Sequence, residues 1–478
     1  MNQTNHTPAH CGPKNGVCLT VNQDTALGAG TSATRLNPVH LSTAAVLLVA
    51  LVAMPACKLV TQEQPQPRRP VRFAVISDPH LHDAHLGNSG AAFEKYVAED
   101  PKLLRESEAI LEAALKSVAA ERVQFVLISG DLTKDGELVN HRRMVRHLTR
   151  SERAGIQVFV VPGNHDINNP EAVMYLGDTN RPVQSVTPQQ FAALYSRFGY
   201  GQAIDRDPHS LSYVAEPVAG LWLLAIDSCK YDASRQVRSN VISGRIRPET
   251  ITWIKAKLQQ AQAGGKLVIA FMHHGLNQHF IGQNEQFGQY LVDDWQGVST
   301  QLARAGLKVI FTGHYHSQDA AYLVNETLEP VSALCDVETA SLVQYPCAFR
   351  IVTLDTNNVL RIESRRVTQI NADTGGVPFQ QYAEHFLRTR LPALVARQLV
   401  ARFNLPQDDA AKAAPVIAEA LIANYAGDET PPPETRALID EWVNGPEPRR
   451  TLGLMLRGIW TDLPPTDNDC RLPLNTNY

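Results

Sequence analysis

The sequence predicts a layered α/β domain followed by a helical region. Short apolar runs rich in β-branched residues alternate with helical periods between residues 70 and 370. A polar cluster directly follows five of these runs. Beyond Phe379 the strand-like runs stop and helical patterns remain. We therefore expect residues 67–372 to form the main domain and residues 373–478 to form a helical C-terminal region.

The individual elements follow from the apolar patterns. Several predicted strands are apolar nearly throughout, which is typical of strands covered on both faces. The strands are predicted at 71–77, 123–129, 157–161, 221–227, 267–272, 308–312, 348–354 and 359–365. Leu104, Leu111, Leu115 and Val118 share one face of a helix, with Glu and Lys on the other. Further helices are predicted at 249–262, 292–305, 382–399, 414–425, 434–442 and 451–460.

The composition is that of an ordinary globular protein. Apolar residues make up 44% and charged residues 19% of the 478 residues. The formal net charge is −4, so no global basic field attracts nucleic acid. This balance disfavours a nuclease and a nucleic-acid partner.

Residues 1–66 predict an export signal with a lipobox and a disordered tether. Residues 44–56 are almost continuously apolar. This run is too short to span a membrane, which takes about 20 residues, but has the length of a signal-peptide core. The run ends in Met54-Pro55-Ala56-Cys57, which resembles a bacterial lipobox, in which the cysteine is acylated. We expect export to the periplasm or cell envelope and a membrane anchor at Cys57, the alternative being an ordinary cleaved signal peptide.

Four cysteines follow the leader, namely Cys229, Cys335, Cys347 and Cys470. None forms a CxxC pair, which excludes a zinc ribbon or thioredoxin-type motif. In an oxidising compartment we expect Cys335 to pair with Cys347, because the two are close in sequence. The alternative is four buried free thiols.

Five polar clusters stand at the carboxyl ends of five predicted strands. Open α/β sheets bind their ligands at this edge. Each cluster alone has an ordinary explanation, such as a turn, a capping Asn or a buried imidazole. All five in this order indicate one shared site. The clusters are Asp78-Pro79-His80, Gly130-Asp131, Gly163-Asn164-His165-Asp166, His273-His274 and Gly313-His314-Tyr315-His316.

These residue types favour a pair of metal ions. Imidazole and carboxylate together suit Zn, Fe, Mn or Co. In Asp-x-His and His-x-His, side chains at i and i+2 of an extended backbone project the same way. The glycines before Asp131, Asn164 and His314 allow sharp turns and close approach to ions. Two divalent ions with Asp78, Asp131 and a hydroxide leave a net positive site, which matches an anionic phosphate ester.

Together the motifs resemble those of the calcineurin-like metallophosphoesterase family. The resemblance implies an α/β fold, a metallophosphoesterase β-sandwich flanked by helices (αββα), with the metals at one edge. It also implies a hydrolase with a dinuclear centre of two divalent or transition metal ions, such as Mn, Fe or Zn. Such an enzyme hydrolyses a phosphoester by attack of a metal-bound hydroxide.

The resemblance also implies a role for each residue. Asp78, His80, Asp131 and His316 would hold the first metal. Asp131, Asn164, His273 and His314 would hold the second, with Asp131 bridging. His165 would be the catalytic acid for the leaving oxygen, a task suited to an imidazole. Asp166 either orients His165 or is a turn carboxylate. His274 is expected either to reach the substrate or to support the metal ligands from behind.

The substrate class stays open among three alternatives. The stretch from Asp131 to Gly136 resembles that of relatives acting on cyclic nucleotides or glycerophosphodiesters, which favours a phosphodiesterase acting on a small molecule or lipid headgroup. Gly275 replaces the proline of many such relatives. The second alternative is a phosphomonoesterase or nucleotidase. The third is a non-catalytic metal-binding envelope protein, which the complete ligand set disfavours.

Overall fold

The computed structural model describes residues 69–325, 327–427 and 429–475. The predicted export signal, Cys57 and the tether therefore lie outside the described residues. The described residues belong to one compact unit. Within the described ranges, no helix is both long enough and apolar enough to span a membrane.

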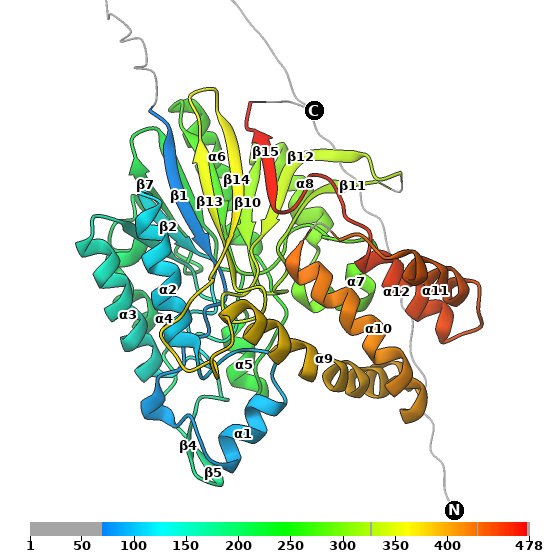
Figure 1. Cartoon of the computed structure of the whole chain (residues 1–478). Coiled ribbons are helices and arrows are strands. Elements are labelled where there is room, and N and C mark those ends of the chain that lie inside the picture. The colour runs from blue at the N-terminus through cyan, green and yellow to red at the C-terminus, as the bar shows by residue number, and fades with distance from the viewer. Residues whose placement is uncertain (1–68, 326, 428, 476–478) are drawn as a thin grey trace, which may run out of the picture. The chain divides into compact units, whose positions relative to one another are not determined.

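Two β-sheets pack face to face in the centre of this unit (Figure 1). The first has the order β15-β14-β13-β1-β2-β3 and the second has the order β11-β12-β10-β9-β8-β7-β6. The first comprises β1 (Val71–Ile76), β2 (Phe125–Ile128), β3 (Gln157–Val160), β13 (Ala348–Leu354), β14 (Val359–Arg366) and β15 (Asp469–Pro473). The second comprises β6 (Asp205–Arg206), β7 (Tyr213–Val218), β8 (Leu221–Ala225), β9 (Leu267–Phe271), β10 (Val309–Thr312), β11 (Asp319–Val324) and β12 (Pro330–Glu338). A small hairpin, β4 (Val173–Leu176) and β5 (Thr179–Pro182), stands apart.

Buried aromatic residues join the two sheets. Phe73 on β1 stacks on Phe125 of β2 and meets the ring of Phe311 on β10 edge to face at 5.8 Å. The strands β2 and β10 are buried along their whole length, because both of their faces are covered. The predicted β-sandwich is confirmed.

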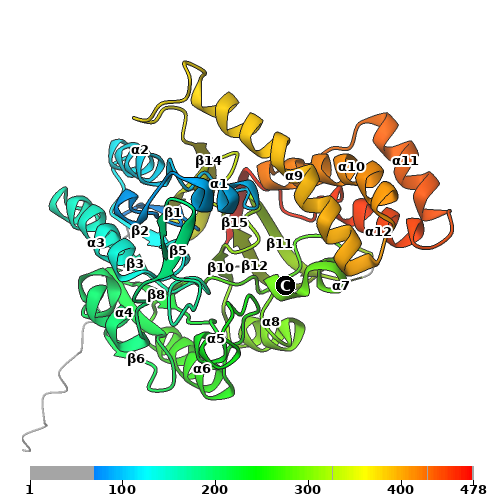
Figure 2. The same cartoon turned by 90° about the horizontal axis from the view of Figure 1, so that it is seen from below.

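Helices cover the outer faces of both sheets (Figure 2). On the second sheet, Ile254 and Leu258 of α6 and Leu302 of α8 share a buried apolar cluster with the strand residues. The helices before the C-terminal region are α1 (Ala91–Ala98), α2 (Ser107–Ala120), α3 (Leu138–Arg153), α4 (Pro188–Leu194), α5 (Tyr231–Val237), α6 (Pro248–Ala263), α7 (Gln283–Phe287) and α8 (Trp295–Arg304). The order of layers is therefore helix, sheet, sheet, helix.

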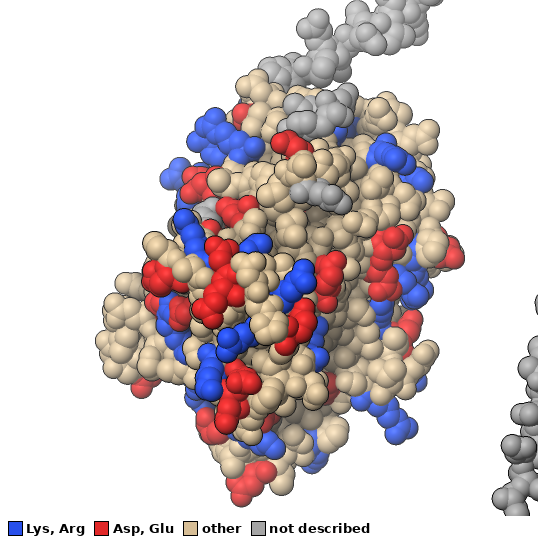
Figure 3. All heavy atoms as spheres, turned by 90° about the vertical axis from the view of Figure 1, so that its right-hand side faces the viewer, with Lys and Arg blue, Asp and Glu red and all other residues tan. Residues whose placement is uncertain are grey.

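Four helices form the C-terminal region, as the sequence predicts. They are α9 (Phe379–Phe403), α10 (Gln407–Ala426), α11 (Pro433–Val443) and α12 (Arg449–Ile459). They build an apolar cluster of their own that also takes in Phe280 and Tyr315 from the main domain. Figure 3 shows the side of the molecule where these helices lie, with basic and acidic side chains interspersed.

Two features of the C-terminal half differ from the sequence predictions. The chain does not end in helix: β15, red in Figure 1, pairs with β14 at the edge of the first sheet. The expected disulfide between Cys335 and Cys347 is wrong. Cys335 lies in the second sheet, whereas Cys347 directly precedes β13 of the first. All four cysteines that the structure describes are buried and outside any disulfide, which was the alternative prediction.

Candidate metal centre

Five loops at one edge of the two sheets carry the predicted ligands. The strands β1, β2 and β3 run parallel to one another, and so do β8, β9 and β10. Their carboxyl ends therefore reach the same edge. The structure brings together there all seven predicted metal ligands, Asp78, His80, Asp131, Asn164, His273, His314 and His316.

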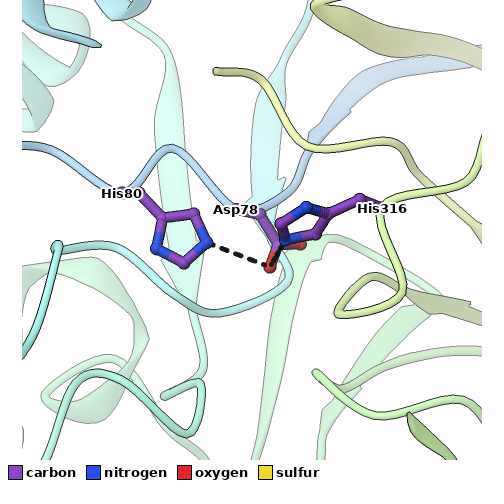
Figure 4. A group of neighbouring side chains, drawn as sticks. All are labelled: Asp78, His80 and His316. Carbon is purple, nitrogen blue, oxygen red and sulfur yellow. Dashed lines mark ion pairs between the residues drawn. The ribbon is translucent and has the colours of Figure 1, made fainter. Parts of the chain in front are cut away.

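The first group consists of Asp78, His80 and His316 (Figure 4). The Oδ1 atom of Asp78 lies 3.3 Å from Nε2 of His316 and 3.8 Å from Nε2 of His80. Asp78 and His80 are fully buried. One carboxylate oxygen and two imidazole nitrogens thus face a common point.

The second group consists of Asp131, His273 and His314. The Nε2 atom of His273 lies 3.4 Å from Oδ2 of Asp131 and 2.9 Å from Oδ1 of Asn164. The same Oδ2 atom lies 3.6 Å from Nε2 of His80 in the first group. Asp131 therefore stands between the two groups. This is the position of the bridging ligand that the family resemblance implies.

Unpaired polar atoms show that these groups fit metal ions. Four buried atoms have no hydrogen-bond partner: Oδ1 of Asp78, both ring nitrogens of His80 and Nε2 of His314. Leaving such atoms buried and unpaired costs about 1–3 kcal/mol each, which a cation would offset. Burial holds the pKa of His80 and of His314 well below the usual value, so both rings are neutral and present lone pairs.

His273 behaves differently from the other imidazoles. Burial lowers its pKa, but the Asp131 carboxylate, together with Asp78 and the carbonyl oxygen of Ser129, outweighs burial and raises the pKa to about 9. Its Nδ1 atom lies 2.9 Å from the carbonyl oxygen of Ser129, which leaves Nε2 directed at Asp131. A metal at this point would replace the proton on Nε2 and satisfy the same carboxylate.

The ligand loops have an unusual backbone. The expectation that the paired ligands lie on extended backbone is wrong, because five of them have φ in the left-handed region. Non-glycine residues avoid this region unless their surroundings compensate, and such strain gathers at functional sites. The five are Asp78 (φ 49°), His80 (φ 36°), Asp131 (φ 47°), His314 (φ 77°) and His316 (φ 72°).

The predicted glycines permit the close packing of these loops. A Cβ atom on Gly163 would lie 2.1 Å from Oδ1 of Asp131. On Gly313 it would lie 1.8 Å from Oγ of Ser77 and 2.4 Å from Oδ2 of Asp78. No larger residue fits these positions unless the ligand carboxylates move.

His165 is oriented by Asp135 and not by Asp166. Its Nδ1 atom lies 2.8 Å from Oδ1 of Asp135, and its Nε2 atom lies 4.0 Å from Oδ2 of Asp131. Asp166 instead accepts hydrogen bonds from the backbone N–H groups of Leu132, Thr133 and Gly163. Of the two interpretations of Asp166, the turn carboxylate is therefore correct.

Asp135 was missed by the sequence analysis, although it stands four residues after Asp131 in the same loop. A buried cation, Lys134, forms an ion pair with it and lies 4.1 Å from the centre of the Tyr96 ring. Burial alone would raise the pKa of Asp135, but Lys134 and His165 together outweigh it and lower the pKa to about 2. Asp135 therefore remains an anion that fixes Nδ1 of His165 as the donor.

His274 does not reach the cavity. Its Nδ1 atom lies 2.8 Å from Oγ of Ser228, and its Nε2 atom lies 2.8 Å from the carbonyl oxygen of Ile242. The ring is fully buried, and burial lowers its pKa to about 3. Both nitrogens have hydrogen-bond partners away from the cavity, and the ring centre lies 4.4 Å from that of His314. Of the two expected roles, the structure therefore favours support of a metal ligand over contact with the substrate.

A cavity of about 260 Å³ opens over the ligands. Its far wall comes from the C-terminal helices, a contribution without any sequence motif. Lys102 and Glu99 also line it. The helical wall consists of Leu391, Leu394 and Val395 on α9 and Leu421 and Tyr425 on α10. Phe287, Tyr290 and Tyr315 of the main domain line the same cavity.

The chain is similar to one known protein family and to several solved structures. The model of the calcineurin-like phosphoesterase family matches residues 71–318, more than half of the chain. Among solved structures, a dimetal phosphatase from Danio rerio is 13% identical over 63% of this chain and 97% of that chain, with a TM-score of 0.44. The purple acid phosphatase PPD1 from yellow lupin (Lupinus luteus) seeds is 12% identical over 63% of this chain and 52% of that chain, with a TM-score of 0.39. A search of curated proteins gave no match.

The chain belongs to the calcineurin-like phosphoesterase family and is a metal-dependent phosphoester hydrolase.

Proposed function

We propose that the enzyme hydrolyses phosphodiesters in which one ester group is apolar, such as those of a small molecule or a lipid headgroup. The observation that carries this proposal is the apolar wall opposite the ligands. An ester group bound against Leu391, Leu394 and Leu421 would leave its phosphorus beside the two ligand groups. Burying such a group contributes about 25 cal/mol for each Å² removed from water.

The charge of the cavity also favours a diester. Among the described residues that line it, Lys102 is the only lysine or arginine. Its Nζ atom lies 3.1 Å from Oδ2 of Asp100, and Glu99 lines the same cavity. A diester carries one negative charge, whereas a monoester carries close to two at neutral pH. Apart from the metals, the cavity thus offers little positive charge for the second one.

In this proposal the seven ligands hold two divalent ions such as Mn, Fe or Zn, which when bound supply Lewis-acid charge to the phosphoryl oxygens. The chain itself supplies the proton. Nε2 of His165 lies beside the bridging Asp131 and on the cavity wall. Asp135 holds Nδ1, so Nε2 is the atom that donates to the leaving oxygen.

The test compares a chromogenic diester with the matching monoester. The purified protein, loaded in turn with Mn, Zn or Fe, is expected to show a kcat/KM at least about tenfold higher for bis-p-nitrophenyl phosphate than for p-nitrophenyl phosphate. Asp131→Ala serves as the control for contaminating activity. A monoester preference would make the enzyme a phosphatase. Inactivity on both substrates with metal bound would support the binding-protein alternative.

We also propose that the protein is exported and held at the membrane by acylation of Cys57, because residues 54–57 resemble a lipobox after an apolar run. Cys57→Ser should move the protein from the membrane fraction to the soluble fraction of the envelope. Cys11→Ser, in the same leader, is the matched control. Unchanged membrane association of the Cys57 variant would contradict the anchor.

A further inference from the structure

A second group of acidic side chains lies between the metal centre and the C-terminal region. Asp319 begins β11, three residues after His316, whereas Glu429 follows α10 and Asp467 precedes β15. One oxygen of each carboxylate lies within 4.8 Å of the other two. The three residues are only 3%, 7% and 0% exposed, respectively. None of them belongs to the metal centre described above.

Glu429 provides the observation that points to a ligand. Its Oε1 atom accepts a hydrogen bond from Nδ2 of Asn424 at 2.5 Å, but its Oε2 atom is buried without any hydrogen-bond partner. A buried carboxylate oxygen without a partner is costly. Burial, and then the charge of Asp319, raise the pKa of Glu429 to about 8, so at neutral pH this side chain ionises only where a cation compensates its charge.

The surroundings are negative as well. Asp336 and Glu338 of β12 are buried beside the group. His279 lies between these acids, with Nδ1 at 3.0 Å from Oδ1 of Asp319 and Nε2 at 3.5 Å from Asp336 and 3.6 Å from Glu338. Arg350 donates to backbone carbonyl oxygens nearby. Among the described residues, His279 and Arg350 thus stand beside five buried acidic side chains, and burial raises the pKa of Glu338 as well as that of Glu429.

We propose that Asp319, Glu429 and Asp467 bind a calcium ion that is separate from the catalytic metals. The three offer only oxygen atoms, which selects a hard cation over zinc or iron. Calcium accepts six to eight oxygens in irregular geometry, including bidentate carboxylates. Magnesium usually keeps several waters, which suits a fully buried site less well.

The position of this site gives it a structural role. Its ligands come from three segments that are far apart in sequence, one of which continues directly from the loop of His314 and His316. Oγ of Ser317 in that loop donates to Oδ1 of Asn424 at 2.5 Å. A Cβ atom on Gly427 would lie 2.5 Å from the carbonyl oxygen of Gln318, so α10 ends tightly against the same loop. Calcium would fasten the C-terminal region to the metal centre.

The test is calcium binding by the full-length enzyme with its catalytic metals in place. After removal of free calcium, titration with CaCl2 is followed by calorimetry and by thermal unfolding. We expect one calcium per chain and a rise in Tm of about 3 °C or more at saturation. Glu429→Gln should weaken calcium binding at least tenfold and abolish the rise in Tm. Its catalytic metal content, measured by mass spectrometry, should equal that of the unaltered protein.

Glu434→Gln is the matched control, because it makes the same change at an exposed carboxylate five residues further along. It should bind calcium like the unaltered protein. Asp467→Asn provides a second variant if Glu429→Gln does not fold. The proposal is overturned if calcium neither binds nor raises the Tm. It is also overturned if Glu429→Gln and Asp467→Asn respond to calcium like the control, or if Glu429→Gln is stabilised in calcium-free buffer, which would show that the carboxyls share protons instead.

Discussion

The two walls of the active-site cavity are built in opposite ways. One wall consists of loops that follow parallel strands, with buried polar atoms, left-handed backbone and glycines at the closest contacts. The other consists of apolar side chains on ordinary helices, α9 and α10. The loop wall binds the atoms that react, where small displacements matter. The helical wall only has to match the shape and polarity of a substrate, and many apolar sequences can do so.

This contrast predicts that changes in the loop wall affect the chemistry and that changes in the helical wall affect the choice of substrate. Asp131→Ala should have the largest effect, because it removes an atom close to both ligand groups. We expect loss of bound metal and a fall in kcat/KM of about 10³-fold or more. Metal analysis and steady-state kinetics measure both. Asp408→Ala, an exposed change on α10, is the control, and full metal content in Asp131→Ala would refute the bridging role.

His165→Ala should separate proton transfer from metal binding. We expect kcat to fall about 10²–10⁴-fold with the metal content unchanged. The loss should be smaller for a p-nitrophenyl leaving group, which needs little protonation, than for an alkyl one. His385→Ala, at an exposed position on α9, controls for loss of an imidazole. An equal loss for both leaving groups would contradict the role of His165 as an acid.

Asp135→Asn should act on the chemistry only through His165. A partner that orients a catalytic imidazole typically contributes about 10–100-fold. The variant should lose that factor in kcat, but it should lose nothing further when His165 is already alanine. The double-mutant cycle is needed because Lys134 loses its ion-pair partner in the same variant. Additive losses would show that Asp135 acts by stabilising the fold alone.

Leu394→Ala should have the smallest effect and is the sharpest test of the helical wall. Leu394 is only half-buried, so its loss should leave the fold intact. We expect KM to rise about fivefold, or about 1 kcal/mol, for a diester with a long apolar group and to stay unchanged for a methyl ester. Leu454→Ala, at a position 47% exposed on α12, is the control. A fall in kcat or in metal content would contradict the assignment of chemistry to the loop wall and of substrate choice to the helical wall.

The loop wall was predictable from the sequence because its chemistry depends on particular residue types at short spacing. The strands before it were predictable because they are buried on both faces and therefore apolar. The left-handed backbone of Asp78 and His314 was not predictable, since the tertiary packing around Gly130 and Gly313 imposes it. Asp135 was overlooked because its contact with His165 joins residues 30 positions apart.

The C-terminal region was also predictable only in part. Its helices follow from apolar periodicity, but their place above the metal centre depends on long-range packing of Tyr315 and Phe280. The strand β15 was missed because it is short, lies at a sheet edge and alternates exposed charged residues with Cys470 and Leu472. The disulfide prediction failed because closeness in sequence ignores the separation of the two sheets.

The sheet order has a consequence for where the domain ends. The family match stops at residue 318, yet β1, which delivers Asp78, is hydrogen-bonded to β13, and β15 completes the same sheet through β14. A fragment limited to residues 71–318 would expose the open edge of β1 and so invite aggregation. The segment by which the family is recognised is therefore smaller than the unit that folds. During synthesis, all six strands of this sheet can pair only after residue 473 has left the ribosome.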